Sequence, residues 1–162
     1  MALEDDIDFL DQIPTLHILG REVLRILAIS AESIRVEGGD VLFEEGQPAD
    51  GGYVVLNGAI LLRSAREPKA NESAMIARLG ALIGETALLV DTIRPATATA
   101  LETSTVLRIP RSVFLRTLEG EPGAAAALRK VISRRVRGVL DELDIVAPLF
   151  KVTNQPRDPN PR

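Results

Sequence analysis

The sequence predicts an α+β protein in which an antiparallel β-roll of jelly-roll type lies between N-terminal and C-terminal helices. Two observations predict this class. Between residues 31 and 110, short apolar stretches alternate with glycine-containing turns, which is typical of a roll or barrel. Before and after this region, apolar residues recur at helical spacing. We therefore divide the chain into an N-terminal helical segment (1–30), a β-roll (31–110), C-terminal helices (111–152) and a disordered tail (153–162).

Composition limits the chemistry that the chain can perform. Of its 162 residues, 46% are hydrophobic and 3% aromatic, so we expect one domain with an aliphatic core. The absence of cysteine excludes disulfides, cysteine-ligated zinc and thiol catalysis, and it permits the cytoplasmic location that we expect. The net charge of −4 argues against a dedicated nucleic-acid-binding protein. No apolar run is long enough to span a membrane.

Residues 4–30 are predicted to be helical. The helical spacing is interrupted at Pro14, and Thr15 is placed to cap a second helix. The single histidine of the chain, His17, lies near the start of this helix and cannot form a multi-histidine metal site. Because no acid–base partner is evident, we interpret it as a partly exposed surface residue. The apolar stripe of the second helix comprises Leu16, Leu19, Val23, Leu24 and Leu27.

The roll region contains a series of short predicted strands. Asn57-Gly58 lies between two apolar runs, which is the strongest short-range indication of a β-hairpin. Residues 64–73 are polar and are predicted to form an exposed loop. The expected strands are 33–37, 41–43, 52–56, 59–63, 73–79, 96–101 and 104–109, the last two as a pair.

Two helices are predicted after the roll. The first begins at Pro110 and ends at the turn Gly120–Gly123, and the second runs from about 123 to 146. Apolar residues of the second helix are spaced as in a coiled-coil seam, and this seam either folds back over the roll or pairs with a second copy of the chain. We favour the homodimer. The seam residues are Ile132, Val136, Val139, Leu143 and Val146.

The stretch from Gly84 to Ala98 combines residue types that suit a phosphorylated sugar. Gly84 allows the backbone to approach a ligand closely, and a turn beginning there can direct several N–H groups at one point. Arg94 offers a planar donor fork that fits a phosphate. Glu85 offers acceptors for sugar hydroxyls.

The spacing of this stretch resembles the phosphate-binding cassette of cyclic nucleotide-binding domains, which reads Gly-Glu-x-Ala-Leu-x, five residues, then Arg-x-Ala-Thr/Ser. The resemblance covers roughly residues 15–145 and implies a β-roll with a short cassette helix. Two glycines at 51–52 replace bulkier residues of the family and are expected to loosen their turn. The residues that match the cassette are Gly84, Glu85, Ala87, Leu88, Arg94, Ala96 and Thr97, and those that match an upstream hairpin of the family are Phe43, Gly46, Pro48, Asp50, Tyr53, Val55 and Gly58.

The resemblance also implies a role for each cassette residue. It assigns Arg94 to the cyclic phosphate and Glu85 to the ribose 2′-hydroxyl. The backbone N–H groups of Gly84, Thr86 and Ala87 would bind the phosphate oxygens, and Ala96 and Thr97 complete the motif. Val55 and Leu82 are expected to pack against the base.

Pro95 departs from the family pattern. The residue after the cassette arginine usually offers its own N–H to the phosphate, and a hydroxyl there favours guanine, whereas proline has neither group. We therefore expect weaker phosphate binding than is usual in the family, and cAMP in preference to cGMP. A chain that has lost nucleotide binding is also compatible with this proline.

Arg135 is the last candidate site residue. From Arg94 to Arg135 the chain is similar to the cyclic nucleotide-binding domain of bacterial cyclic nucleotide-regulated potassium channels, in which an arginine of the last helix lies over the purine. Arg135 would then stack on the base as a cation–π partner. The alternative is a solvated basic face, since this helix also contains Arg129, Lys130, Arg134 and Arg137.

These observations predict a regulatory protein rather than an enzyme. We expect it to bind a cyclic nucleotide without a cofactor or metal, and to signal by moving residues 111–146 toward a protein partner or a second copy. Residues 147–162 are too few for a helix-turn-helix, and no channel segment is evident, so DNA and membrane partners are not expected. The alternatives are a β-roll interaction scaffold without a ligand and a DNA-binding protein that uses the basic helix.

Overall fold

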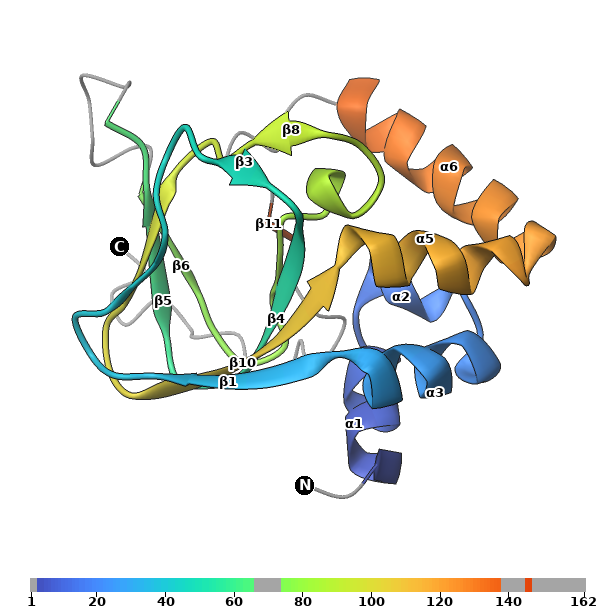
Figure 1. Ribbon diagram of the computed structural model, residues 1–162, viewed down its shortest axis with the longest axis horizontal. Helices are drawn as coiled ribbons and strands as arrows, with labels where there is room; N and C mark the ends of the chain where they lie inside the picture. The colour runs from blue at the N-terminus through green and yellow to red at the C-terminus, as the bar shows by residue number, and fades with distance from the viewer. Residues whose placement is uncertain (1–2, 66–73, 138–144, 147–162) are drawn as a thin grey trace, which may run out of the picture.

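The computed structural model describes residues 3–65, 74–137 and 145–146 of the chain. In Figure 1 the strands form a roll, and the helices gather at one side of it. The N-terminal helices are α1 (Leu3–Leu10), α2 (Pro14–His17) and α3 (Arg21–Ser30). The helix predicted to follow Pro14 is therefore two helices, because Gly20 between them has a φ of 89°, which does not fit an α-helix. Thr15 lies inside α2 rather than at its cap, which is Ile13.

Among the described residues the strands form three antiparallel sheets, which confirms the predicted roll. The orders are β1-β10-β4-β7-β11, β2-β9-β5-β6 and β3-β8. Within the described residues, the bounds are β1 (Glu32–Val36), β2 (Val41–Phe43), β3 (Pro48–Ala49), β4 (Gly51–Asn57), β5 (Ile60–Arg63), β6 (Met75–Ala77), β7 (Leu82–Ile83), β8 (Thr92–Ile93), β9 (Thr97–Ala100), β10 (Ser104–Pro110) and β11 (Ile145–Val146).

The turn at Asn57-Gly58 joins two strands that are not paired with each other. β4 pairs with β10 and β7, whereas β5 pairs with β6 and β9. The predicted hairpin is therefore wrong, and so is the predicted pairing of residues 96–101 with 104–109, since β9 and β10 also lie in different sheets. Gly58 has a φ of 96° and leaves no room for a Cβ, which would lie 2.1 Å from the Oγ of Ser104. The turn therefore passes the chain from one sheet to the other.

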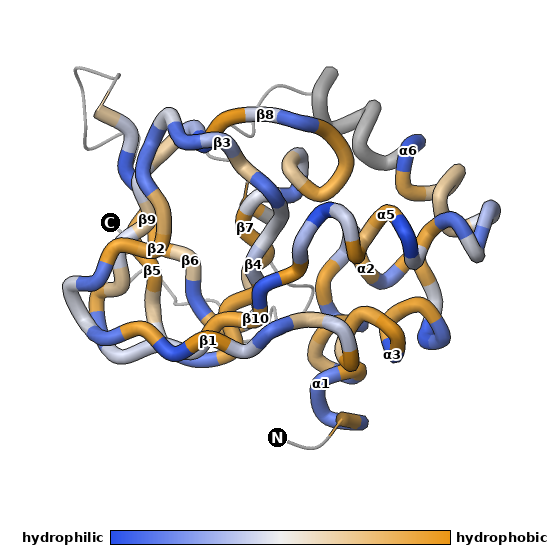
Figure 2. The backbone as a smooth tube through the Cα atoms, in the orientation of Figure 1, coloured by the Kyte–Doolittle hydropathy of each residue, from blue (hydrophilic) through white to orange (hydrophobic). Residues whose placement is uncertain are grey.

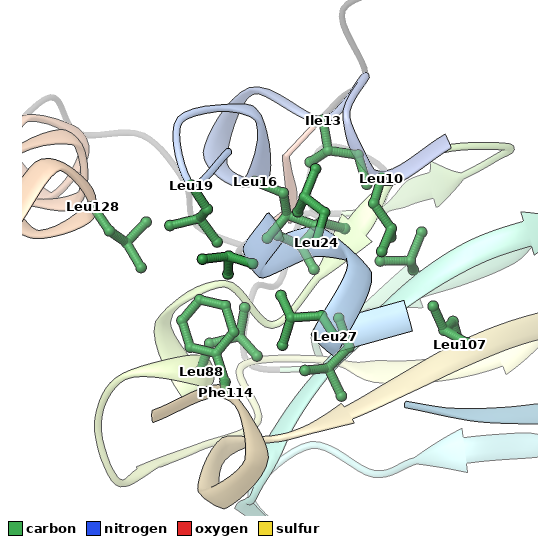
Figure 3. Packing of buried hydrophobic residues seen from close by; sticks show 14 of the residues in the cluster. Leu10, Ile13, Leu16, Leu19, Leu24, Leu27, Leu88, Leu107, Phe114 and Leu128 are labelled. Carbon is green, nitrogen blue, oxygen red and sulfur yellow. The ribbon is translucent and has the colours of Figure 1, made fainter. Parts of the chain in front are cut away.

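In the part of the chain that the structure describes, the core consists of two mainly aliphatic clusters. One fills the roll and includes Val55, Ile60, Ile83 and Val106. The other lies between the helices and the outer face of the five-stranded sheet, and Figure 3 shows Leu27, Leu88 and Phe114 within it. Figure 2 shows the corresponding hydrophobic segments in the strands and in the helices. Because Leu88 belongs to η1 (Thr86–Leu88), the short helix after β7, this helix packs directly on the helical layer.

The C-terminal helices are α5 (Arg111–Glu119) and α6 (Pro122–Arg137). The prediction of one helix up to residue 146 is wrong at its end, because residues 145–146 form β11 and pair with β7. Of the predicted seam, Val139 and Leu143 lie outside the described residues, and so do the side chains of Ile132, Val136 and Val146. The tail from 153 also lies outside them. In the part of the chain that the structure describes, no helix is long and apolar enough to cross a membrane.

Candidate functional site

Gly84 brings the cassette backbone against the side chain of Arg94. It follows β7 directly and has a φ of 85°, a conformation that other residues rarely adopt. A Cβ at this position would lie 2.8 Å from Nη1 of Arg94 and 3.0 Å from the carbonyl oxygen of Gly51. The two residues ten positions apart in the sequence therefore meet, as the cassette pattern implies.

The upstream loop fixes the backbone of Arg94. The N–H of Arg94 donates to the carbonyl of Gln47 at 2.8 Å, and the N–H of Gly46 donates to the carbonyl of Arg94 at 2.8 Å. β3 and β8 continue this pairing, with Pro48 opposite Ile93. The loop that resembles the family's hairpin signature is thus the loop that holds the cassette arginine in place.

The side chain of Arg94 is only 3% exposed and lies among aromatic rings of the roll interior. Its guanidinium carbon is 4.2 Å from the centroid of the Phe43 ring and 5.5 Å from that of Tyr53. The two rings are stacked, with centroids 5.8 Å apart. One ion-pair partner, Asp50, has its Oδ1 3.8 Å from Nη2 of Arg94. The arginine therefore occupies a preformed, largely desolvated position.

Asp50 is shared with a second arginine. Its Oδ2 accepts a hydrogen bond from Nη2 of Arg108 at 2.8 Å. Partial burial lowers the pKa of Arg108, but the charge of Asp50 and this hydrogen bond outweigh it, so the pKa is raised above its ordinary value. The exposed carboxylate of Asp50 therefore lies between two arginines, with one oxygen toward each.

Glu85 is buried and held by the helical layer. It is 3% exposed, and the hydroxyl of Thr15, itself buried in α2, donates a hydrogen bond to its Oε2. Sequence reasoning placed Thr15 at a helix cap and missed this contact over 70 residues. The acid therefore links the cassette to the N-terminal helices, whereas its role toward a ribose hydroxyl stays a prediction.

The remaining cassette residues lie in η1 and at or just before the start of β9. Ala87 and Ala96 are buried, and Thr86 and Pro95 are half-buried. Thr97 accepts a hydrogen bond at its Oγ1 from the N–H of Glu45 at 2.9 Å, which ties the end of the cassette to the upstream loop.

The predicted base contacts are divided between the two clusters. Val55 belongs to the cluster inside the roll. Leu82 belongs to the helical cluster, and its neighbour Ile83 lies inside the roll instead. Leu82 and Ile83 differ because successive residues of a strand point to opposite faces. The contacts of Val55 and Leu82 with a base stay predictions.

The candidate lid residue Arg135 lies in α6, but its side chain is outside the described residues. Its role over a base stays a prediction. Among the residues that the structure describes, no group of three or more histidine or carboxylate side chains is placed to hold a metal ion.

Arg111, the first residue of α5, was missed by the sequence reasoning. Its Nη1 donates to the carbonyl oxygens of Ala49 (2.8 Å), Ala87 (3.2 Å) and Val90 (3.1 Å), and its Nη2 lies 2.5 Å from Oδ1 of Asp91. These partners belong to β3 and to the cassette helix with the turn after it. Arg111 therefore fastens the first C-terminal helix to the cassette.

An apolar groove lies between the cassette and the C-terminal helices, away from Arg94. It has a volume of about 510 Å³ and is lined by Leu89, Val90, Leu115, Leu118, Glu119, Ala125 and Arg129. None of the predicted site residues lines it, so it is not the phosphate site.

Comparison with known proteins identifies the arrangement. Residues 33–121, more than half of the chain, match the family model described as the cyclic nucleotide-binding domain. A cyclic nucleotide-binding-like protein from Brucella abortus is 36% identical, with a TM-score of 0.62, over 71% of this chain and 98% of that chain. The N-terminal domain of a transcriptional regulator from Streptomyces coelicolor is 32% identical, with a TM-score of 0.71, over 81% of this chain and 94% of that one.

A larger enzyme also contains a similar region. Lysophospholipase nte1 from Aspergillus fumigatus is 32% identical over 126 residues, which are 76% of this chain. The chain spans only 8% of the length of that lysophospholipase.

Proposed function

Because the chain belongs to the cyclic nucleotide-binding domain family, we propose that it binds cAMP in preference to cGMP and acts as a regulatory module rather than an enzyme. The observation that supports this most strongly is Arg94, a buried guanidinium that lies directly against the glycine of a cassette turn. A buried cation beside backbone amides is the arrangement that a phosphate requires.

In the proposed complex, the cassette residues bind different parts of the nucleotide. Arg94 binds the cyclic phosphate through its donor fork. The turn that begins at Gly84 brings the N–H groups of Thr86 and Ala87 to the same phosphate. Glu85 accepts from the ribose 2′-hydroxyl while Thr15 continues to hold its second oxygen, since a carboxylate has enough lone pairs for both.

The preference for cAMP rests on Pro95. Proline removes one N–H donor from the phosphate site, and it provides no hydroxyl for the exocyclic groups of guanine. The same loss lowers the expected affinity for either nucleotide.

We propose that the C-terminal helices transmit the binding event to a protein partner or a second copy. Arg111 joins α5 to the carbonyls of Ala87 and Val90, so a shift of the cassette helix moves the start of α5. The groove between the cassette and α5 leaves room for such a shift. A ligand drives this change only by the difference in its affinity for the two arrangements.

Calorimetric titration of nucleotide-free protein tests the binding proposal. Binding of cAMP, weaker binding of cGMP, and no binding of linear AMP are expected, because the cassette is matched to a cyclic phosphate. Absence of heat from both cyclic nucleotides, with the protein folded and free of copurified nucleotide, would exclude the sensor function. The interaction scaffold without a ligand would then be favoured.

Replacement of Arg111 by glutamine tests the transmission proposal. Loss of its bonds to three carbonyls is expected to lower the free energy of unfolding by about 1–3 kcal/mol and to uncouple α5 from the cassette. Hydrogen exchange of the α5 amides should then respond to cAMP in the wild-type protein but not in the variant, while binding persists. An equal response of α5 in both proteins would contradict the role of Arg111. Arg116→Gln, a change farther along α5, serves as the matched control.

A further inference from the structure

The position of Arg94 depends on two aromatic residues to which the cassette pattern assigns no role. Phe43 and Tyr53 come from β2 and β4, which belong to different sheets, and their rings stack inside the roll. The guanidinium carbon of Arg94 lies over both rings, at 4.2 Å from the nearer centroid. The chain is only 3% aromatic, so this pair accounts for a large part of its aromatic content.

Burial of the guanidinium removes its hydration, and attractive contacts within the protein must offset the free energy that this costs. Arg94 is 3% exposed, and its guanidinium lies over the rings of Phe43 and Tyr53, which belong to the interior cluster. The ion pair with Asp50 is long, at 3.8 Å, and Asp50 is closer to Arg108. The negative faces of the two rings supply a further electrostatic attraction that is strongest where water is excluded.

The stacking also determines which part of the guanidinium can bind a ligand. The N–H donors of arginine lie in the plane of the guanidinium, so a ring over its face does not compete for them. Nη1 lies beside Gly84, at the start of the cassette turn. The rings therefore support the face of the guanidinium while the edge of the fork is directed at the place where a phosphate would meet the cassette.

We propose that Phe43 and Tyr53 are positioning residues that hold the guanidinium of Arg94 in its phosphate-binding orientation before the ligand arrives. The consequence for affinity rests on the proposed function, whereas the effect on Arg94 itself does not. Because the fork is already in place, binding does not include the cost of ordering a long side chain.

Affinity measurements on a matched pair of variants test the consequence for binding. Phe43→Leu keeps an apolar side chain but removes the ring face, and we expect it to weaken cAMP binding about tenfold. Phe43→Tyr keeps the ring and should restore most of the affinity. Phe9→Leu makes the same change on α1, in the helical layer, and should leave the affinity unchanged. Equal affinities for Phe43→Leu and Phe9→Leu would overturn the proposal.

A thermal double-mutant cycle in nucleotide-free protein tests the contact without any ligand. Phe43→Leu and Arg94→Met are made singly and together. The Tm loss of the double variant is expected to be smaller than the sum of the single losses by about 3 °C, because each single variant already removes the contact. Additive losses would overturn the proposal. If the wild-type protein binds no cyclic nucleotide, the proposed function fails, and this cycle alone decides whether the rings hold Arg94.

Discussion

Replacement of Arg94 by alanine is expected to weaken cAMP binding by about ten- to a hundredfold, since a charge-assisted hydrogen bond contributes about 1.5–3 kcal/mol. Arg94 is buried against Gly84 at the start of the cassette turn. The nearby Arg108 and Arg111 already make hydrogen bonds of their own, to Asp50 and to the backbone around the cassette helix. Calorimetric titration of the variant and the wild-type protein measures the difference.

The control for this variant is Arg35→Ala. Arg35 lies on β1, is 70% exposed and pairs with the exposed Glu37, so its removal should change neither affinity nor stability appreciably. Thermal unfolding of Arg94→Ala is measured in parallel, because removal of a buried side chain also lowers stability. Wild-type affinity in a folded Arg94→Ala protein would contradict the assignment of the phosphate site.

Replacement of Gly51 by alanine is expected to lower the free energy of unfolding by about 3 kcal/mol or to prevent folding. Gly51 lies opposite Pro110 in the register of β4 with β10. A Cβ there would lie 2.2 Å from the carbonyl oxygen of Ile109 and 2.9 Å from Cα of Pro110, both backbone atoms that cannot move aside singly. Chemical denaturation measures the loss.

Gly123→Ala is the matched control for Gly51→Ala. Gly123 lies in the first turn of α6, and a Cβ there meets nothing within 4 Å. The same substitution should therefore be neutral or stabilise the protein by up to about 1 kcal/mol, because alanine is the better helix former. Similar effects of the two substitutions would contradict the close approach of β4 to β10.

The expectation that the glycines at 51–52 loosen a turn is wrong, since both lie within β4 and are buried.

The cassette could be read from the sequence because its residues are close together in the chain. The spacing from Gly84 to Arg94 encodes a local turn, a short helix and a return strand, and the structure brings these two residues into contact. The apolar spacing of the helices and the short strands was equally local, and the α+β class followed from it.

Contacts between distant segments could not be read in this way. The Asn57-Gly58 turn has the composition of a hairpin, but β4 pairs with β10 and β7. Local composition does not reveal such pairing with distant segments. The register of β7 with β4 determines which of Leu82 and Ile83 points into the roll. A shift of this register by one residue would exchange the faces to which the two side chains point. The partners of Thr15 and Arg111 lie in other segments, and three of those of Arg111 are backbone carbonyls, which leave no mark in the sequence.

The proposed function requires a cyclic nucleotide to bind at the cassette with its phosphate on Arg94. Titration of isotope-labelled, nucleotide-free protein with cAMP, followed by amide correlation spectra, is the decisive experiment because it reports both binding and position. We predict the largest shifts at the amides of Gly84, Glu85, Thr86 and Ala87 and at the side-chain Nε of Arg94, with smaller shifts at the start of α5. Unchanged spectra at saturating cAMP, or shifts confined to another face of the roll, would show that the cassette is not the nucleotide site.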